Sequence, residues 1–195
     1  MKYPLDLSFK ILALASQIYM RDADGTLVGY VKQKMFKLKE DIGVFADEGK
    51  TQLLFNVKAD RIIDFSASYR FTNADGTVLG SIKRKGMRSI FKAHYLIFDP
   101  TDNQVMEIHE ENGWIKVIDA LVGEVPVLGM FTGYLFNPAY IVSRMDGQQV
   151  MKLQKEPAFL ESKFKLLPLG QIEGDEETLV LLSALTMTLL ERSRG

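Results

Sequence analysis

The 195-residue sequence contains no cysteine. Disulfide bonds, thiolate metal sites and thiol nucleophiles are therefore excluded, and the composition is compatible with a reducing compartment. The apolar patch at residues 11–15 is short, and the nearby Asp6, Lys10 and Gln17 make it a poor match to a signal peptide. We therefore expect a cytoplasmic protein.

Recognised catalytic motifs are missing as well. There is no glycine-rich phosphate loop followed by Lys-Ser/Thr, no Gly-x-Ser-x-Gly elbow and no His-Glu-x-x-His pair. Glu107, His109 and Glu111 would project from one face of a strand and offer three ligands to zinc or manganese. Glu110 is adjacent and His94 is the only other histidine, so a hydrated strand edge is the preferred interpretation. We predict no catalytic residue, no metal site and no cofactor.

What the sequence does have is an internal repeat. Residues 23–29 read Ala-Asp-Gly-Thr-Leu-Val-Gly, and residues 74–80 read Ala-Asp-Gly-Thr-Val-Leu-Gly. An Asp-Gly pair followed by aliphatic residues predicts a β-hairpin with a two-residue turn in which both residues take positive φ angles. A weaker third copy begins at Asp146 and Gly147. A hairpin unit repeated along one chain predicts a meander or a barrel.

Strand patterns continue through most of the chain. Residues 64–72 alternate, with Phe65, Ala67, Tyr69 and Phe71 on one face. Hydrophobic residues make up 47% of the sequence and no low-complexity linker interrupts it, so we expect one domain over residues 1–195. We count ten to twelve strands. Further predicted strands cover residues 53–57, 95–98, 105–109, 140–144 and 160–166.

The end of the chain has a different pattern. Residues 178–190 are uncharged and mostly apolar; three acidic residues precede them, and arginines follow. This distribution suits a helix dipole, with Asp175 as the N-cap, and predicts a helix over residues 175–191. A helix that is apolar around its whole circumference must be surrounded by protein or lipid. At about 20 Å it is shorter than a bilayer core of roughly 30 Å, so enclosure by strands is the better prediction.

Charge is unevenly distributed along the chain. Residues 1–98 carry 16 Lys and Arg against 10 Asp and Glu, whereas residues 99–195 carry 8 against 15. These basic residues fit two interpretations, solvated strand ends that protect an edge from aggregation or a site for phosphate or anionic lipid. The candidate ligand-binding residues are Lys32, Lys34, Lys83, Arg84, Lys85 and Arg88.

Residues 114–136 form the other unusual stretch. They contain the only tryptophan, paired aliphatic residues suited to a short helix, and a glycine-rich apolar segment. The preferred interpretation is an excursion that closes one mouth of the barrel. The alternative is an apolar lip that touches a membrane or covers a lipid-like ligand.

Taken in order, these segments resemble the LURP-one-related family, which is grouped with tubby C-terminal domains and phospholipid scramblases. The resemblance rests on the Asp-Gly hairpin repeat, residues 136–140, the return through residues 144–148 to Phe164, and the terminal helix after residues 175–177. It implies a mainly β fold, a closed antiparallel barrel of about twelve strands around a C-terminal hydrophobic helix.

The resemblance also suggests a class of function. Tubby-type domains bind phosphoinositide head groups through basic surface residues, whereas scramblases add a lipidated cysteine cluster and a calcium motif that this chain lacks. We therefore expect a non-enzymatic binding module that recognises anionic lipid head groups or a membrane surface, peripherally, with no nucleic-acid partner. The alternative is an intracellular carrier or protein-interaction scaffold that uses residues 114–136.

Overall fold

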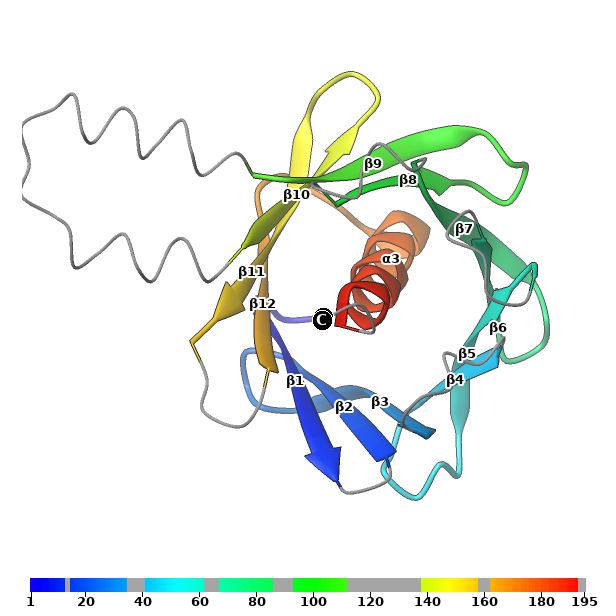
Figure 1. Cartoon of the computed structure of the whole chain (residues 1–195), viewed down its shortest axis with the longest axis vertical. Helices are drawn as coiled ribbons and strands as arrows, with labels where there is room; N and C mark the ends of the chain where they lie inside the picture. Colours follow the sequence, from blue (N-terminus) through cyan, green and yellow to red (C-terminus); the bar gives the residue numbers. More distant parts are fainter. Residues whose placement is uncertain are drawn as a thin grey trace, which may run out of the picture.

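The computed structural model describes residues 1–12, 15–34, 41–61, 67–85, 93–111, 138–157 and 162–192. Each strand within these residues pairs antiparallel with the next, and β12 pairs with β1, so the sheet closes into a barrel around the helix (Figure 1). The prediction of a mainly β fold, with about twelve strands and one C-terminal helix, is confirmed. The elements are β1 (Leu5–Leu12), β2 (Ala15–Arg21), β3 (Leu27–Lys34), β4 (Asp41–Phe45), β5 (Leu53–Ala59), β6 (Ser68–Asn73), β7 (Val78–Arg84), β8 (His94–Phe98), β9 (Gln104–Glu110), β10 (Ala139–Arg144), β11 (Gln149–Glu156), β12 (Ser162–Pro168) and α3 (Gly174–Arg192).

Most of the strands predicted by alternation are present. Residues 53–57, 95–98, 105–109 and 140–144 lie in β5, β8, β9 and β10. Ala67 and Phe71 are buried, as the alternation around β6 predicts, although residues 62–66 lie outside the described residues. In β12, Phe164 and Leu166 point into the core.

Four hairpins share one turn, at residues 22–26, 73–77, 99–103 and 144–148. In each turn, the N–H of the first residue donates to the carbonyl of the fifth residue, and the N–H of the fourth residue donates to the carbonyl of the first. The N to O distances are 2.8–3.1 Å. The fourth residue is left-handed, with φ between 63° and 90° (Gly25, Gly76, Asp102 and Gly147). This is a three-residue loop that ends in a left-handed position. The predicted two-residue turn is therefore wrong, because glycine alone of the Asp-Gly pair takes a positive φ.

The repeated segments occupy equivalent places in the barrel. They form the hairpins β2–β3, β6–β7 and β10–β11, which are four strands apart. Gly80 of β7 has a φ of 141°, and a Cβ there would lie 2.4 Å from the carbonyl oxygen of Phe98 and 2.8 Å from Cδ1 of Leu179. The glycine therefore allows α3 to approach β7 closely, which agrees with the off-centre position of the helix (Figure 1).

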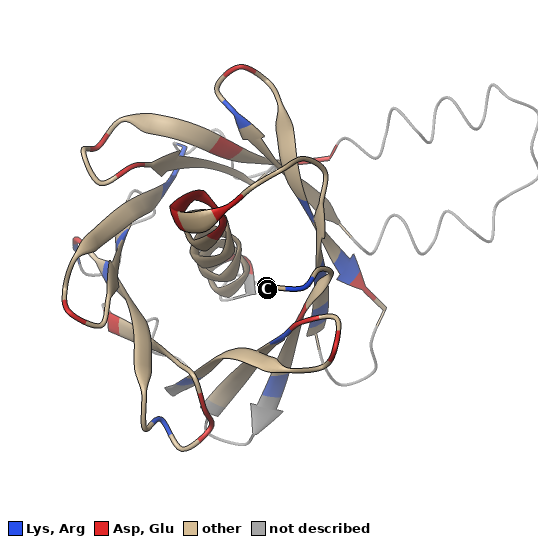
Figure 2. Ribbon diagram, turned by 180° about the vertical axis from the view of Figure 1, so that it is seen from behind, with Lys and Arg blue, Asp and Glu red and all other residues tan. Residues whose placement is uncertain are grey.

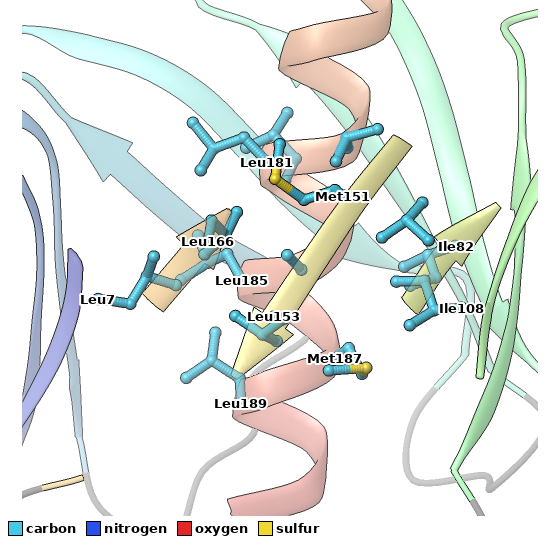
Figure 3. Packing of buried hydrophobic residues seen from close by; sticks show 14 of the residues in the cluster. Leu7, Ile82, Ile108, Met151, Leu153, Leu166, Leu181, Leu185, Met187 and Leu189 are labelled. Atoms are coloured by element: carbon cyan, nitrogen blue, oxygen red, sulfur yellow. The ribbon is translucent and has the colours of Figure 1, made fainter. Parts of the chain in front are cut away.

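The core consists of α3 and the inward residues of the strands. Residues 179–189 of the helix are all buried, including Ser183, Thr186 and Thr188. Thr186 and Thr188 donate their hydroxyls to the carbonyls of Leu182 and Ala184 at 2.7 Å. Figure 3 shows helix side chains directed at strand residues on more than one side of the helix. The labelled members of this cluster are Leu7, Ile82, Ile108, Met151, Leu153, Leu166, Leu181, Leu185, Met187 and Leu189.

The helix begins one residue earlier than predicted, at Gly174, which places Asp175 in its first turn rather than at the N-cap. Asp175, Glu176 and Glu177 still complement the positive end of the helix dipole. Among the described residues, no helix combines the length and the hydropathy needed to cross a bilayer.

Replacing Leu185 with alanine should lower the free energy of unfolding by about 2–5 kcal/mol, because Leu185 is fully buried and its removal leaves a cavity. Leu169→Ala is the matched control, since Leu169 is 47% exposed and should change stability by less than about 0.5 kcal/mol. Denaturant unfolding measures both. Equal effects of the two substitutions would contradict the enclosed helix.

The turn aspartates should make the barrel sensitive to acid. Hydrogen bonds from Thr51, Thr77 and Thr101 lower the pKa of Asp47, Asp75 and Asp99 below the ordinary 3.8. Because the folded pKa is depressed, this stabilisation is present above pH 3.8 and is lost as the pH falls through the folded pKa values. The melting temperature of an Asp75→Asn/Asp99→Asn variant should fall less on acidification than that of the wild type. An identical pH profile would show that these carboxylates do not contribute.

Candidate functional site

The direction of the strands decides which charges come together. Because neighbours are antiparallel, all odd-numbered strands end at one end of the barrel. α3 follows β12 and ends at this same end, where its Glu191 meets the last residue of β7. We call this the basic end, and the opposite end, where the shared hairpin turns lie, the turn end.

The lysines of the predicted cluster lie at the basic end. Lys32 of β3 and Lys83 of β7 occupy equivalent positions in the two repeats, and both side chains are exposed. Lys85 directly follows β7 and is also exposed, and Lys34 is the last residue of β3. Arg88 lies outside the described residues. Three strands separate β3 from β7, so the cluster is spread over the rim rather than gathered at one point.

Arg84 differs from the lysines on either side of it. Its side chain is 7% exposed, its Nη1 lies 3.5 Å from Oε1 of Glu191, and its guanidinium lies 5.7 Å from the ring centroid of Tyr95. Gly80 and Ile82 face the interior, so the alternation of β7 also turns Arg84 inward. This period of two was visible in the sequence and could have separated Arg84 from Lys83 and Lys85.

Arg84 belongs to a polar group that covers the core at the basic end. The hydroxyl of Tyr95 donates to Oε1 of Glu191 on the helix. The pKa values of Tyr95 and Tyr140 are raised above the ordinary 10.0, mainly because both side chains are buried and also because the negative charge of Glu191 is near. Both hydroxyls therefore stay protonated. No local pattern in the sequence predicts this group, because its members lie far apart along the chain and only the closed barrel brings them together.

A second arginine holds the helix at the turn end. Arg144 donates from Nε and Nη2 to the two carboxylate oxygens of Glu176, both at 2.7 Å, and from Nη2 to the carbonyl of Gln171 at 2.9 Å. Its Nη1 donates to Gln148. Such a bidentate pair is geometrically specific. The helix is therefore held at both ends by an arginine of the barrel wall.

The turn end is acidic. Figure 2 shows Asp and Glu in the turns around this end of the barrel. Residues 22–26, 46–52, 74–77, 99–103, 145–148 and 169–173 together hold nine Asp and Glu and one Lys. Several of these aspartates accept hydrogen bonds from the backbone of their own turn, such as Asp22 from Thr26 and Asp99 from Asn103. They therefore have a structural role in the turns.

Of the alternative metal ligands Glu107, His109 and Glu111, the two carboxylates have protein partners. Glu107 Oε2 lies 3.0 Å from Nε2 of His94, and Glu111 accepts from Lys152 at 2.7 Å. His109 stands opposite His94 in the strand register. Within the described ranges, no three His, Asp or Glu side chains are grouped so that they could hold a metal ion. Residues 114–136, the alternative apolar lip, lie outside the described residues.

Replacing Arg84 with alanine should destabilise the barrel by about 1–3 kcal/mol, because it removes a buried guanidinium whose Nη1 lies 3.5 Å from the half-buried Glu191 carboxylate. An Arg84→Met/Glu191→Gln variant should recover part of this loss. Lys83→Ala, at the neighbouring exposed position, should stay within about 0.5 kcal/mol of the wild type. Denaturant unfolding measures all three, and a neutral Arg84→Ala would argue against the inward role.

Comparisons with known proteins agree with this architecture. The X-ray structure of a protein from Arabidopsis thaliana superposes with a TM-score of 0.50 at 13% sequence identity, covering 96% of this chain and 91% of that one. At this identity the likeness shows the fold. A search of curated proteins found no match. The family model described as LURP-one-related matches residues 27–155, more than half of the sequence. The chain belongs to the LURP-one-related family.

Proposed function

We propose that this protein is a non-enzymatic binding module that attaches peripherally to anionic lipid head groups at a membrane surface through lysines at the basic end. The observation that carries the proposal is that Lys32, Lys83 and Lys85 are exposed, and none of them forms an ion pair with a described residue. Lysines that neutralise local acids would be paired. Unpaired lysines keep their full charge for a ligand.

The position of these lysines supports the same conclusion. β3 and β7 run in the same direction, so their last residues can face one surface together. Each Lys near an anionic membrane contributes on the order of 1 kcal/mol, so a few suffice for weak and reversible attachment. The formal net charge of −1 does not oppose this, because the acidic turns lie at the far end of the barrel.

Arg84 faces the interior and supports the barrel, so it is not proposed as a ligand contact. A carrier or protein-interaction scaffold based on residues 114–136 stays a prediction from the sequence.

The test is co-sedimentation with vesicles of phosphatidylcholine and phosphatidylserine at low salt. Lys83→Ala/Lys85→Ala should weaken binding roughly 30-fold, since two lysines at about 1 kcal/mol each are removed. Lys2→Ala/Lys50→Ala is the matched control, because it removes the same charge near the turn end. Added salt should weaken the binding of the wild type.

Two results would contradict the proposal. One is that the wild type stays in the supernatant at low salt. The other is that both double variants sediment equally well, in which case the lysines only solvate and protect the strand ends. Circular dichroism spectra and melting temperatures should be unchanged in both variants, which separates loss of binding from loss of folding.

A further inference from the structure

The exposed lysines at the basic end extend beyond the two repeats. Lys10 of β1 and Lys58 of β5 are also exposed, and neither forms an ion pair with a described residue. Lys10 and Lys32 stand on either side of Gln17 in one row of the sheet, and the Lys10 ammonium lies 5.3 Å from the ring centroid of Tyr19. β1, β3, β5 and β7 therefore each carry an exposed lysine near their last residue. We call Lys10, Lys32, Lys58, Lys83 and Lys85 the basic rim.

Whether the rim presents arginine or lysine affects how it can bind a phosphate group. Arginine presents a planar fork that binds a phosphate group bidentately, whereas lysine is a compact, strongly hydrated point charge. Arg84, one of the two arginines of the predicted cluster, is turned into the barrel and engaged with Glu191, and the other, Arg88, lies outside the described residues. Arg61, which follows β5, lies 3.5 Å from Asp60. Arg70, which stands opposite Lys58 in the sheet, has its Nη2 3.8 Å from Oδ1 of Asp102. The rim cations that form no ion pair with a described carboxylate are therefore lysines.

The wide spacing of the lysines along the rim also favours an extended charged surface as the partner. The five lysines are distributed over seven neighbouring strands, from β1 to β7, on a convex outer wall. A single head group is small compared with this arc and would meet only one or two of them. A bilayer surface that carries many negative charges meets all of them at once, and the acidic turns at the opposite end would be repelled by it.

We propose that the basic rim docks on an anionic bilayer by charge density, without selecting a head group, and with the C-terminal end of α3 toward the bilayer. This inference rests on the proposed function and defines the partner more closely. A stereospecific phosphoinositide site would need a local set of converging donors. The basic rim instead offers separate point charges along an arc.

The first experiment compares two vesicle compositions of matched surface charge, one with phosphatidylserine and one with phosphatidylinositol 4,5-bisphosphate. Affinities should agree within about twofold, and soluble inositol trisphosphate at micromolar concentration should not compete. Lys10→Ala/Lys58→Ala should weaken binding to both compositions by a similar factor, on the order of tenfold or more. The Lys2→Ala/Lys50→Ala variant is again the charge-matched control.

A preference of tenfold or more for the phosphoinositide vesicle, or competition by inositol trisphosphate, would overturn the inference and leave the proposed function standing. Absence of binding to any vesicle would overturn both. Binding to heparin in the absence of vesicle binding would indicate a soluble polyanion as the partner and would also overturn both.

The second experiment uses the absence of cysteine, because any introduced cysteine is a unique labelling site. Gln17→Cys places an environment-sensitive fluorophore in the row between Lys10 and Lys32, and Ala74→Cys places it in an exposed turn at the turn end. On bound vesicles, brominated lipid should quench the label at position 17 and leave the label at position 74 unchanged. Equal quenching, or quenching at position 74 alone, would show that the barrel docks in another orientation.

Discussion

The structure depends on one constraint, which is that a helix with an apolar surface all the way round has to be enclosed. A helix with one polar face could lie on a sheet, but residues 179–189 are buried on every side and leave no face for water. The sheet therefore has to close around the helix, and the twelve strands that the structure describes do so without leaving an edge. Gly80 shows how closely the wall follows the helix, because even a methyl group at this position would meet Leu179 and the Phe98 carbonyl.

The two ends of the enclosed helix carry charged side chains, which need partners. Arg144 forms an ion pair with Glu176 where the helix begins, and Arg84 forms one with Glu191 where it ends. Both arginines are the last residue of a strand, so they reach the mouths of the barrel without entering the apolar region between them. The two pairs place charge only at the mouths, and they hold the helix at a defined position along the barrel axis.

The same strand geometry separates the outer charges. The even-to-odd connections are tight turns whose backbone N–H groups need acceptors, and Asp or Asn supplies them, so acidic side chains gather at the turn end. Near the ends of β1, β3, β5 and β7, by contrast, each strand carries an exposed lysine. A chain with a net charge near zero thus folds into a barrel that has acidic turns at one end and exposed lysines at the other. This separation is the physical basis for the proposed attachment to an anionic surface.

Local pattern in the sequence determined the elements. Alternation of period two, the Asp-Gly repeats and the uncharged run at residues 178–190 predicted the strands, the hairpins and the enclosed helix, because each depends on neighbouring residues. The turn type was predicted wrongly, because an Asp-Gly pair is compatible both with a two-residue turn that has two left-handed residues and with a three-residue loop that has one. Only the tertiary structure decided that Arg84 faces inward to Glu191 while Lys83 and Lys85 stay exposed, and that Lys10 and Lys58 join the same rim. These relations join residues from separate strands and from the distant helix, and they exist only once the barrel has closed.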